Sequence, residues 1–437
     1  MSGEVIRKES KRLREYYYEK TLDSGLIVCV FPKKLSTSYA IIGTRYGSID
    51  NAFKTEGEAE FTAYPEGIAH FLEHKLFENE DGVDAFERYA RFGANANAFT
   101  TFDKTAYLFS AADSFYESLE VLLDFVSHPF FNAEKVNKEQ GIISQEIRMG
   151  EDNPHRRLFS ELMKIMYQSH PIRMDIAGTV ESISRITPEV LYACYNAFYR
   201  PSNMVLSVCG DLDETRVFEM AERFFPPREE KKVITAPIEE PRAVLKQKTE
   251  CRMDVAKPLF NIGVKNPDVE DDPLERMRTC AGMSILSDML FSKSGHFYNS
   301  LYEKGLLSNS FDYGYAARRS FAFFDMSGES RDPDAVYEAF AACIEEAKTN
   351  GLSREDFEIN KRVTYASTIR QFESTEDIAV EMMEAAMDGD GLFAYSDIVQ
   401  SVSFEDVERL LHERFLKEYF CMSVILPQQT DGEGESA

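Results

Sequence analysis

The chain has 437 residues and a formal net charge of -26, with 75 acidic side chains against 49 lysines and arginines. This length exceeds what one hydrophobic core usually organises, so two or more domains are expected. The negative charge repels phosphate groups and anionic lipid headgroups, which excludes nucleic acid and membranes as favoured partners. It favours cationic ligands such as basic peptides, although an acidic surface also serves solubility alone.

The first residues and the cysteines indicate a compartment. Residues 1–20 are rich in charged side chains and lack the apolar segment of a signal peptide. No apolar run reaches the length of about 18 residues that a membrane span needs. The seven cysteines are widely spaced and form no C-x-x-C pair, which indicates reduced thiols. The sequence therefore predicts a cytoplasmic protein without a membrane segment.

Strand-like and helical patterns alternate along the first half of the chain. Short apolar runs predict strands at 25–31, 40–43, 105–110 and 204–209. Helical periodicity covers residues 115–127, 133–149 and 191–198. Pairs of strands lie close enough in sequence for antiparallel pairing, and the helices come in clusters. This order favours an α+β arrangement over a regular βαβ repeat.

Residues 226–250 interrupt the periodic patterns with prolines and charges, which is typical of a linker. They separate a predicted first domain, 1–225, from a second domain, 251–437. In the second half the strand patterns fall at 259–264, 322–326 and 421–426, and the helical patterns at 334–349, 354–372 and 410–416. Both halves begin with a strand and end with a helix and a strand, which indicates a diverged duplication. The predicted fold is α+β, with two related α/β sandwich domains, each a largely antiparallel sheet packed with helices.

Residues 67–77 contain the spacing His70-x-x-Glu73-His74 inside a helical pattern. Residues four apart lie one turn apart on the same helix face, so both imidazoles can aim at one point. Glu73 is close enough to take a proton from a water held there without binding the metal itself. Imidazole suits zinc, and a catalytic zinc ion keeps three protein ligands and one open position. The alternative is an amphipathic helix with two polar histidines and a solvated Glu73.

A second helix offers candidates for the missing ligand. Glu139 and Glu146 are seven residues apart in the helical pattern of 133–149, so they share a face. One carboxylate could bind the metal while the other fixes the ring of a ligand histidine, a common arrangement around metal sites. The alternative is a pair of exposed acids on an acidic protein.

Five short segments of the first half occur in a specific order: residues 67–74, 93–107, 141–147, 176–183 and 200–205. Together they resemble the inverzincin family of pitrilysin and insulysin zinc peptidases, which includes mitochondrial processing peptidase and half-length bacterial proteins. The resemblance implies that His70 and His74 bind one Zn²⁺ per chain, with Glu146 as third ligand. It further implies that Glu73 is the general base and Glu139 a supporting acid. A two-domain chain of this kind would form half of a clamshell.

The segment Asn97-Ala98-Phe99 would lie on an edge strand beside the metal in the family that the chain resembles. An extended substrate can join such an edge through main-chain hydrogen bonds, which are indifferent to side-chain identity. These three residues are therefore predicted to bind substrate. The alternative is an ordinary strand that follows a helix.

One feature of the family is missing from the second half. Where the family usually has an Arg and, seven residues later, a Tyr, this chain has Tyr302 and then Ser308 or Asn309. Losing such a donor to the developing oxyanion costs on the order of 3 kcal/mol of transition-state stabilisation. A heterodimer with a related metal-less subunit would supply the pair. A homodimer that uses Arg318 or Arg319 with Tyr313 is the alternative.

The sequence thus predicts a zinc-dependent metalloendopeptidase. It would hydrolyse peptides or unfolded protein segments in a closed chamber, as the metal-bearing subunit of a dimer. The competing hypothesis is a non-catalytic structural or assembly subunit with a peptidase-like fold. Neither general peptide turnover nor maturation of a single partner is favoured by the sequence.

Overall fold

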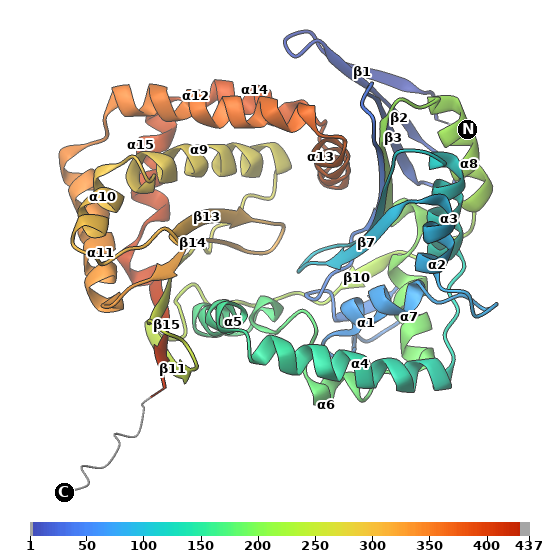
Figure 1. The fold of residues 1–437 in the computed structure, drawn as a ribbon, viewed down its shortest axis with the longest axis horizontal. Coiled ribbons are helices and arrows are strands. Elements are labelled where there is room, and N and C mark those ends of the chain that lie inside the picture. The colour runs from blue at the N-terminus through green and yellow to red at the C-terminus, as the bar shows by residue number, and fades with distance from the viewer. Residues whose placement is uncertain (1–2, 429–437) are drawn as a thin grey trace, which may run out of the picture. The chain divides into compact units, whose positions relative to one another are not determined.

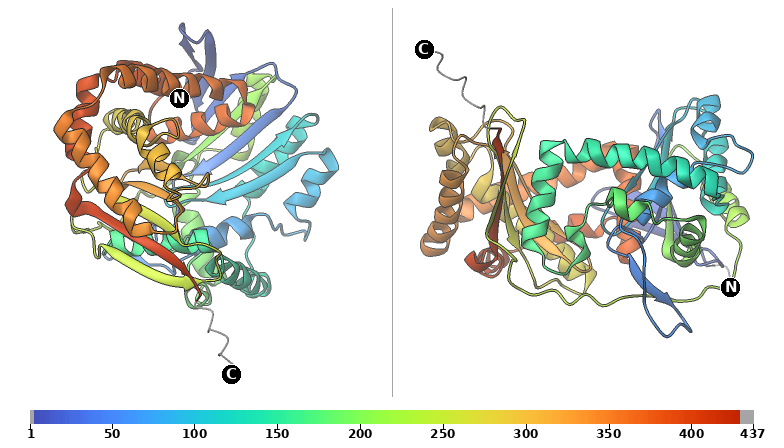
Figure 2. Two further views of the ribbon diagram at one scale, coloured as in Figure 1. Left: turned by 60° about the vertical axis from the view of Figure 1, so that its left-hand side comes forward. Right: turned by 90° about the horizontal axis from the view of Figure 1, so that it is seen from below.

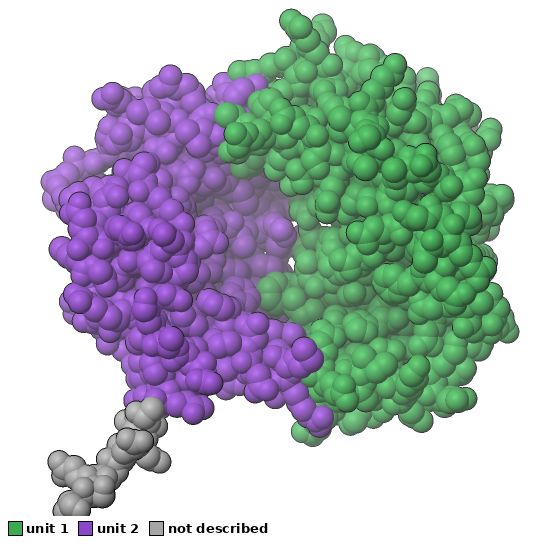
Figure 3. Space-filling model, in the orientation of Figure 1, with its two compact units in different colours: residues 1–147, 174–238, 366–397 green, residues 148–173, 239–365, 398–437 purple. Residues whose placement is uncertain are grey.

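In the computed structural model, which describes residues 3–428, the chain divides into two compact units (Figure 1, Figure 3). Unit 1 comprises the residues up to 147 together with 174–238 and 366–397. Unit 2 comprises 148–173, 239–365 and the residues from 398 onward. The predicted linker at 226–250 includes the change of unit at residue 238, and the boundaries of independently folding domains stay a prediction. No sequence pattern had indicated that residues 148–173 belong to unit 2 or that residues 366–397 belong to unit 1.

Unit 1 is built on a seven-stranded sheet with the order β1-β2-β3-β9-β4-β8-β7. Strands β3 and β9 pair in parallel, and all other neighbours in this sheet pair antiparallel. A smaller sheet has the order β10-β5-β6. The strands are β1 (Ile6–Ser10), β2 (Glu15–Thr21), β3 (Ile27–Pro32), β4 (Ser38–Thr44), β5 (Ala52–Thr55), β6 (Thr62–Ala63), β7 (Asn95–Thr100), β8 (Thr105–Ala111), β9 (Met204–Gly210) and β10 (Val233–Thr235).

Helices cover both faces of the large sheet of unit 1. One face and the helices α1, α3, α7 and α8 share a single hydrophobic core, and α13 covers the other face. The strand predicted at 204–209 is β9, and it is buried along its whole length because both faces of the sheet are covered. The helices of unit 1 are α1 (Ile68–Leu76), α2 (Ala85–Phe92), α3 (Phe115–Ser127), most of α4 (Ala133–Glu151), α6 (Val180–Ile183), α7 (Pro188–Phe198), α8 (Glu214–Phe224) and α13 (Thr375–Asp388).

Unit 2 is built on a five-stranded sheet with the order β11-β15-β12-β14-β13. Its strands are β11 (Lys248–Met253), β12 (Leu259–Lys265), β13 (Asp312–Ala317), β14 (Ala322–Glu329) and β15 (Phe420–Pro427). Its helices are α5 (Pro154–Met166), α9 (Pro273–Phe291), α10 (His296–Glu303), α11 (Pro333–Asn350), most of α12 (Arg354–Arg370) and α15 (Phe404–Arg414). Helix α14 (Ala394–Ser401) contains the last change of unit. No helix within residues 3–428 combines the length and apolar character needed to cross a bilayer.

The two sheets repeat one topology. The strands β3-β9-β4-β8-β7 of unit 1 correspond in order and direction to β11-β15-β12-β14-β13 of unit 2. Helix α13 packs on β4 and β9, and α5 packs on β12 and β15 (Figure 1, Figure 2). A glycine makes room for the helix in each case: Gly43 of β4 lies under Met383, and Gly263 of β12 lies under Met166. This repetition supports the predicted duplication, with each unit taking one helix from the opposite half.

Glu240 fixes the start of the second half to unit 2. Its carboxylate accepts hydrogen bonds from the backbone N–H groups of Gln168, Ser169 and His170 at 2.7–2.9 Å. The ammonium group of Lys265, which is almost fully buried, donates to the same carboxylate at 2.5 Å. A buried charge of this kind requires such full pairing, because an unpaired one would be strongly destabilising.

Beside Glu240, His170 is a buried neutral imidazole. Its Nδ1 accepts a hydrogen bond from the N–H of Ile172 at 3.1 Å, so the proton lies on Nε2, which is 3.1 Å from Ser320 Oγ. Burial lowers the pKa of His170 from 6.5 to about 4, against the opposing charge of Glu240. The folded state therefore resists protonation that the unfolded chain accepts.

We expect unit 2 to lose stability as the pH falls from 6.5 to 4, because protons bind the unfolded His170 more readily than the folded one. The loss attributable to this residue is about 3 kcal/mol. Chemical denaturation of the wild type and of His170→Gln across this window measures it, and the variant should show the flatter pH dependence. His412→Gln, at an exposed histidine of the same unit, is the control. Equal slopes for wild type and His170→Gln would contradict the assignment.

Candidate metal centre

Helix α1 presents the His-x-x-Glu-His residues. It begins after Gly67, whose φ of 86° lies in the left-handed region that glycine adopts without strain. Phe71 and Leu72 are fully buried in the core of unit 1, which fixes the rotation of the helix. The side chains of His70 and His74 are 13% and 27% exposed, so both reach the boundary between core and solvent.

Helix α4 presents the two predicted glutamates. Val136 and Ile143 on this helix are buried in the core of unit 1, and they hold Glu139 and Glu146 on the side that meets α1. Glu139 is almost fully buried, whereas the side chain of Glu146 is 39% exposed. The structure thus brings together all four residues that were predicted to form or support the metal site.

The donor atoms of His70, His74 and Glu146 lie within 4.8 Å of one another. Nε2 of His70 is 3.5 Å from Oε1 of Glu146, and Nε2 of His74 is 3.5 Å from its Oε2. Ligands bound tetrahedrally to zinc at about 2.0–2.1 Å lie roughly 3.3 Å apart. The spacing and the His₂Glu composition therefore fit one zinc ion with a fourth position left for water or substrate.

Glu139 orients His74 from behind. Its Oε1 is 3.1 Å from Nδ1 of His74, so the Nδ1 proton is donated to Glu139 and the Nε2 lone pair is directed at the metal position. Burial raises the pKa of Glu139, but the hydrogen bond from His74 and the charge of Lys75 outweigh this effect and lower the pKa overall. Glu139 is therefore an anion, as its supporting role requires.

Glu73 is a buried carboxyl group that does not belong to the ligand set. It is 8% exposed, and its Oε2 accepts a hydrogen bond from Thr100 Oγ1 at 2.5 Å. Burial raises the pKa of Glu73 above its ordinary value, against the opposing effects of Thr100 and His74. The raised pKa makes Glu73 a weaker acid and a better proton acceptor than an exposed glutamate.

Two side chains at this centre were missed in the sequence. Thr100 lies in the same motif as Phe99, but nothing local indicated that it reaches Glu73. Lys75 is fully buried, with Nζ at 2.7 Å from Glu78 Oε1 and 3.6 Å from Glu139 Oε2. Its position three residues after Leu72, in the apolar stripe of α1, was the available indication that this lysine is buried and needs acidic partners.

The predicted substrate-binding residues lie on β7, an edge strand of the large sheet that packs beside α1. Asn97 is exposed, and Ala98 and Phe99 are partly buried. The backbone N–H of Ala98 donates to Oδ1 of Asn97 at 2.9 Å and so points away from β8. An acceptor from another chain could take the place of this side-chain oxygen. The role of the three residues in substrate binding stays a prediction.

The residues at the family's Arg and Tyr positions belong to unit 2. Tyr302, near the end of α10, is 49% exposed, and Ser308 and Asn309 lie in the segment before β13. Tyr313 of β13 donates a hydrogen bond from its hydroxyl to Asp288 of α9 at 2.8 Å. None of these residues is an arginine, so the missing pair is not restored among the neighbouring positions.

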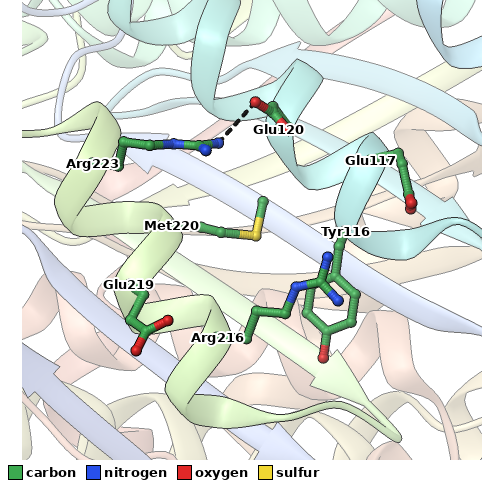
Figure 4. Close-up of a pocket in the computed structure, with 7 residues that line it drawn as sticks. All are labelled: Tyr116, Glu117, Glu120, Arg216, Glu219, Met220 and Arg223. Atoms are coloured by element: carbon green, nitrogen blue, oxygen red, sulfur yellow. Dashed lines mark hydrogen bonds and ion pairs between the residues drawn. The ribbon is translucent and has the colours of Figure 1, made fainter.

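A pocket of about 410 Å³ lies between α3 and α8 (Figure 4), and its lining residues do not include those of the metal site. The guanidinium of Arg216 lies 3.7 Å from the centre of the Tyr116 ring, and Arg223 pairs with Glu120 at 2.8 Å. The charged side chains that line the pocket thus largely neutralise one another. The lining residues are Tyr116, Glu117, Glu120, Arg216, Glu219, Met220 and Arg223.

The fold and the donor set together define a metallopeptidase-like protein. Residues 57–180 match the family described as Insulinase (Peptidase family M16), and residues 185–363 match the Peptidase M16 inactive domain. The uncharacterized zinc protease YmfH of Bacillus subtilis (strain 168) is 36% identical over 424 residues, which cover 96% of this chain and 99% of the relative.

Solved structures agree with these matches. An M16-like peptidase from Alicyclobacillus acidocaldarius is 31% identical and superposes with a TM-score of 0.90 over 98% of this chain and 99% of that one. Pitrilysin superposes with a TM-score of 0.76 over 98% of this chain and 47% of its own, at 16% identity, and so shares the fold. The chain belongs to the M16 peptidase family, which confirms the resemblance that the sequence motifs indicated.

We expect Glu139→Gln to weaken zinc binding by roughly 10–100-fold, because the anionic acceptor of the His74 Nδ1 proton is lost. Competition with a zinc chelator measures the affinity, and Glu146→Gln, which alters a direct ligand, should weaken it further. Glu134→Gln, at an exposed acid of the same helix, is the matched control. Unchanged affinity in Glu139→Gln would remove Glu139 from the support of the site.

Proposed function

We propose that this protein is a zinc-dependent metalloendopeptidase that hydrolyses peptides or unfolded protein segments. The observation that carries the proposal is the meeting of His70, His74 and Glu146 around one point, with the buried Glu73 beside them. Relatives named as zinc proteases add support. A bound zinc ion would polarise the scissile carbonyl and lower the pKa of its water to about 7.

Glu73 supplies the proton transfers in this proposal. As a carboxylate it accepts a proton from the attacking water, and as a carboxylic acid it returns that proton to the leaving amine. Its raised pKa suits both directions, because a strongly acidic carboxyl group would hold the proton too weakly to deliver it. The hydroxyl of Thr100 holds one carboxylate oxygen and so restricts the orientation of the other.

The edge strand β7 supports a mode of substrate binding. A peptide laid antiparallel or parallel to this edge would hydrogen-bond to its outward N–H and C=O groups. A substrate carbonyl would replace Oδ1 of Asn97 as the acceptor for the N–H of Ala98. Such contacts select an extended, unfolded segment rather than a particular side chain. Phe99 would then fix the strand by packing in the cluster beneath α13.

We expect Glu73→Gln to lower kcat by roughly 10²–10⁴-fold, because glutamine cannot accept the proton. Peptide cleavage followed by mass spectrometry measures the loss, and metal analysis should find one zinc per chain in both proteins. Glu80→Gln, at an exposed glutamate after α1, is the control. A Glu73→Gln protein that keeps both zinc and full turnover would exclude Glu73 as the general base. A wild-type protein that is purified together with any partner chain, binds zinc and cleaves nothing would instead favour the structural or assembly role.

We also propose that the active form is a heterodimer with a related metal-less subunit that provides the oxyanion donors. Tyr302 takes the place of the expected arginine, and the hydroxyl of Tyr313 is already engaged by Asp288. A homodimer that uses Arg318 or Arg319 with Tyr313 is the weaker alternative.

The seven free cysteines support a reducing compartment, and the cytoplasm is the proposed location.

Purification of the native complex through a tag on this chain, followed by intact mass measurement, tests the partner. We expect a second M16 chain in equal amount, and activity about 100-fold above that of this chain alone, as expected when a missing oxyanion donor is restored. Preparations of the isolated chain serve as the control. A fully active complex that contains copies of this chain only would exclude the heterodimer.

A further inference from the structure

One face of the unit 2 sheet carries two acidic side chains, Asp312 and Asp325. Asp325 of β14 lies between Gly263 of β12 and Gly314 of β13 in the strand register. Asp312 of β13 faces Ser327, two residues further along β14, and therefore projects from the same face. Such diagonal neighbours lie roughly 7–8 Å apart. Within residues 3–428 neither carboxylate makes an ion pair.

Asn261 of β12 completes this group of oxygens. It lies opposite Ser327 and donates from Nδ2 to Asp325 Oδ2 at 3.3 Å. Asn261 is only 3% exposed, and its Oδ1 is buried without a hydrogen-bond donor from the described part of the chain. Reversing the amide would bring its oxygen against the carboxylate and leave the NH₂ group without that acceptor. Either orientation leaves a buried polar atom that a ligand could satisfy.

The local environment already disfavours the anion of Asp325. Burial raises the pKa of Asp325 from 3.8 to about 6, with a smaller contribution from the charge of Asp312. A nearby cation would favour the charged form of both carboxylates. A positively charged group from outside the chain would therefore stabilise these acceptors.

The space for such a group lies on the side of β13. A Cβ atom at Gly314 would meet no atom within 4 Å, so the position beside Asp325 opens onto free space. Gly263, on the other side, is covered by the side chains of Leu162 and Met166. Because β13 is the edge strand of this sheet, an extended chain can approach the open position directly.

We propose that this face of unit 2 is a subsite for a lysine or arginine side chain of a bound peptide, with Asp312, Asp325 and Asn261 as hydrogen-bond acceptors. That the ligand is a peptide rests on the proposed function. A guanidinium or ammonium group brings several donors and one positive charge to two carboxylates and an amide oxygen. A calcium ion needs six to eight oxygen ligands, and the glycines on both sides of Asp325 supply no side-chain oxygen. The acidity of the whole chain, at -26, further favours a basic ligand.

The test is a binding measurement on the full chain carrying Glu73→Gln, so that no peptide is cleaved. Two fluorescent ten-residue peptides of otherwise identical sequence carry one central arginine or its neutral analogue citrulline. We expect the arginine peptide to bind about 10–100-fold more tightly, the range of a buried charge-assisted contact. Asp325→Asn should abolish this preference, and Asp271→Asn, which removes an exposed charge from the same unit, should preserve it.

Gly314→Val provides a second variant that is expected to fold, because valine is favoured in strands and the position is open. Its side chain would fill the space beside Asp325, so the arginine preference should fall while the melting temperature is maintained. Equal binding of the two peptides by the parent protein would overturn the subsite, as would a preference that survives both Asp325→Asn and Gly314→Val. Because the assay needs no hydrolysis, it tests the subsite separately from the proposed function. An arginine preference in a wild-type complex that contains any partner chain and cleaves no peptide would refute the peptidase function and retain the subsite.

Discussion

The structure depends on holding two imidazoles and one carboxylate, from two different helices, around a single point. His70 and His74 come from α1 and Glu146 from α4, with contacts of 3.5 Å between the imidazole nitrogens and the carboxylate oxygens. Glu73 and Glu139 add negative charge nearby, and like charges in a partly buried site repel. The arrangement is stable because each acid has a partner in the protein. A bound metal cation would neutralise the negative charge that remains.

Two further side chains hold the acidic groups of the metal centre in place. Lys75 is buried within the apolar stripe of α1 and neutralises Glu139 from below, while Thr100 reaches Glu73 from β7. The sheet thus orients the carboxylate of Glu73 through Thr100, while the helix pair α1 and α4 carries Glu73 and the metal ligands. Rigid elements suit such a site, because displacements of even 1 Å impair catalysis.

The chain contains two scaffolds of the same topology with different surface chemistry. Five strands of the unit 1 sheet have the same order as the unit 2 sheet, and each sheet buries one helix from the opposite half over a glycine, at Gly43 and at Gly263. Unit 1 uses its copy to place the His-x-x-Glu-His helix beside an edge strand. Unit 2 has no such motif, and its edge strand β13 and the neighbouring β14 carry Asp312 and Asp325 instead. The same backbone therefore supports a metal centre in one copy and an acidic face in the other.

The sequence by itself determined what local spacing controls: the extents of α3 and β9, the shared face of His70 and His74, and the alignment of Glu139 with Glu146. Helical and strand periods fix such neighbours within a few residues. Only the tertiary structure decided that α5 belongs to unit 2 and α13 to unit 1. It also decided that Thr100 contacts Glu73 and that Asn261 lies beside Asp325. These contacts join segments far apart in the chain. They arise from the summed packing of a whole core, which leaves no periodic trace in the sequence.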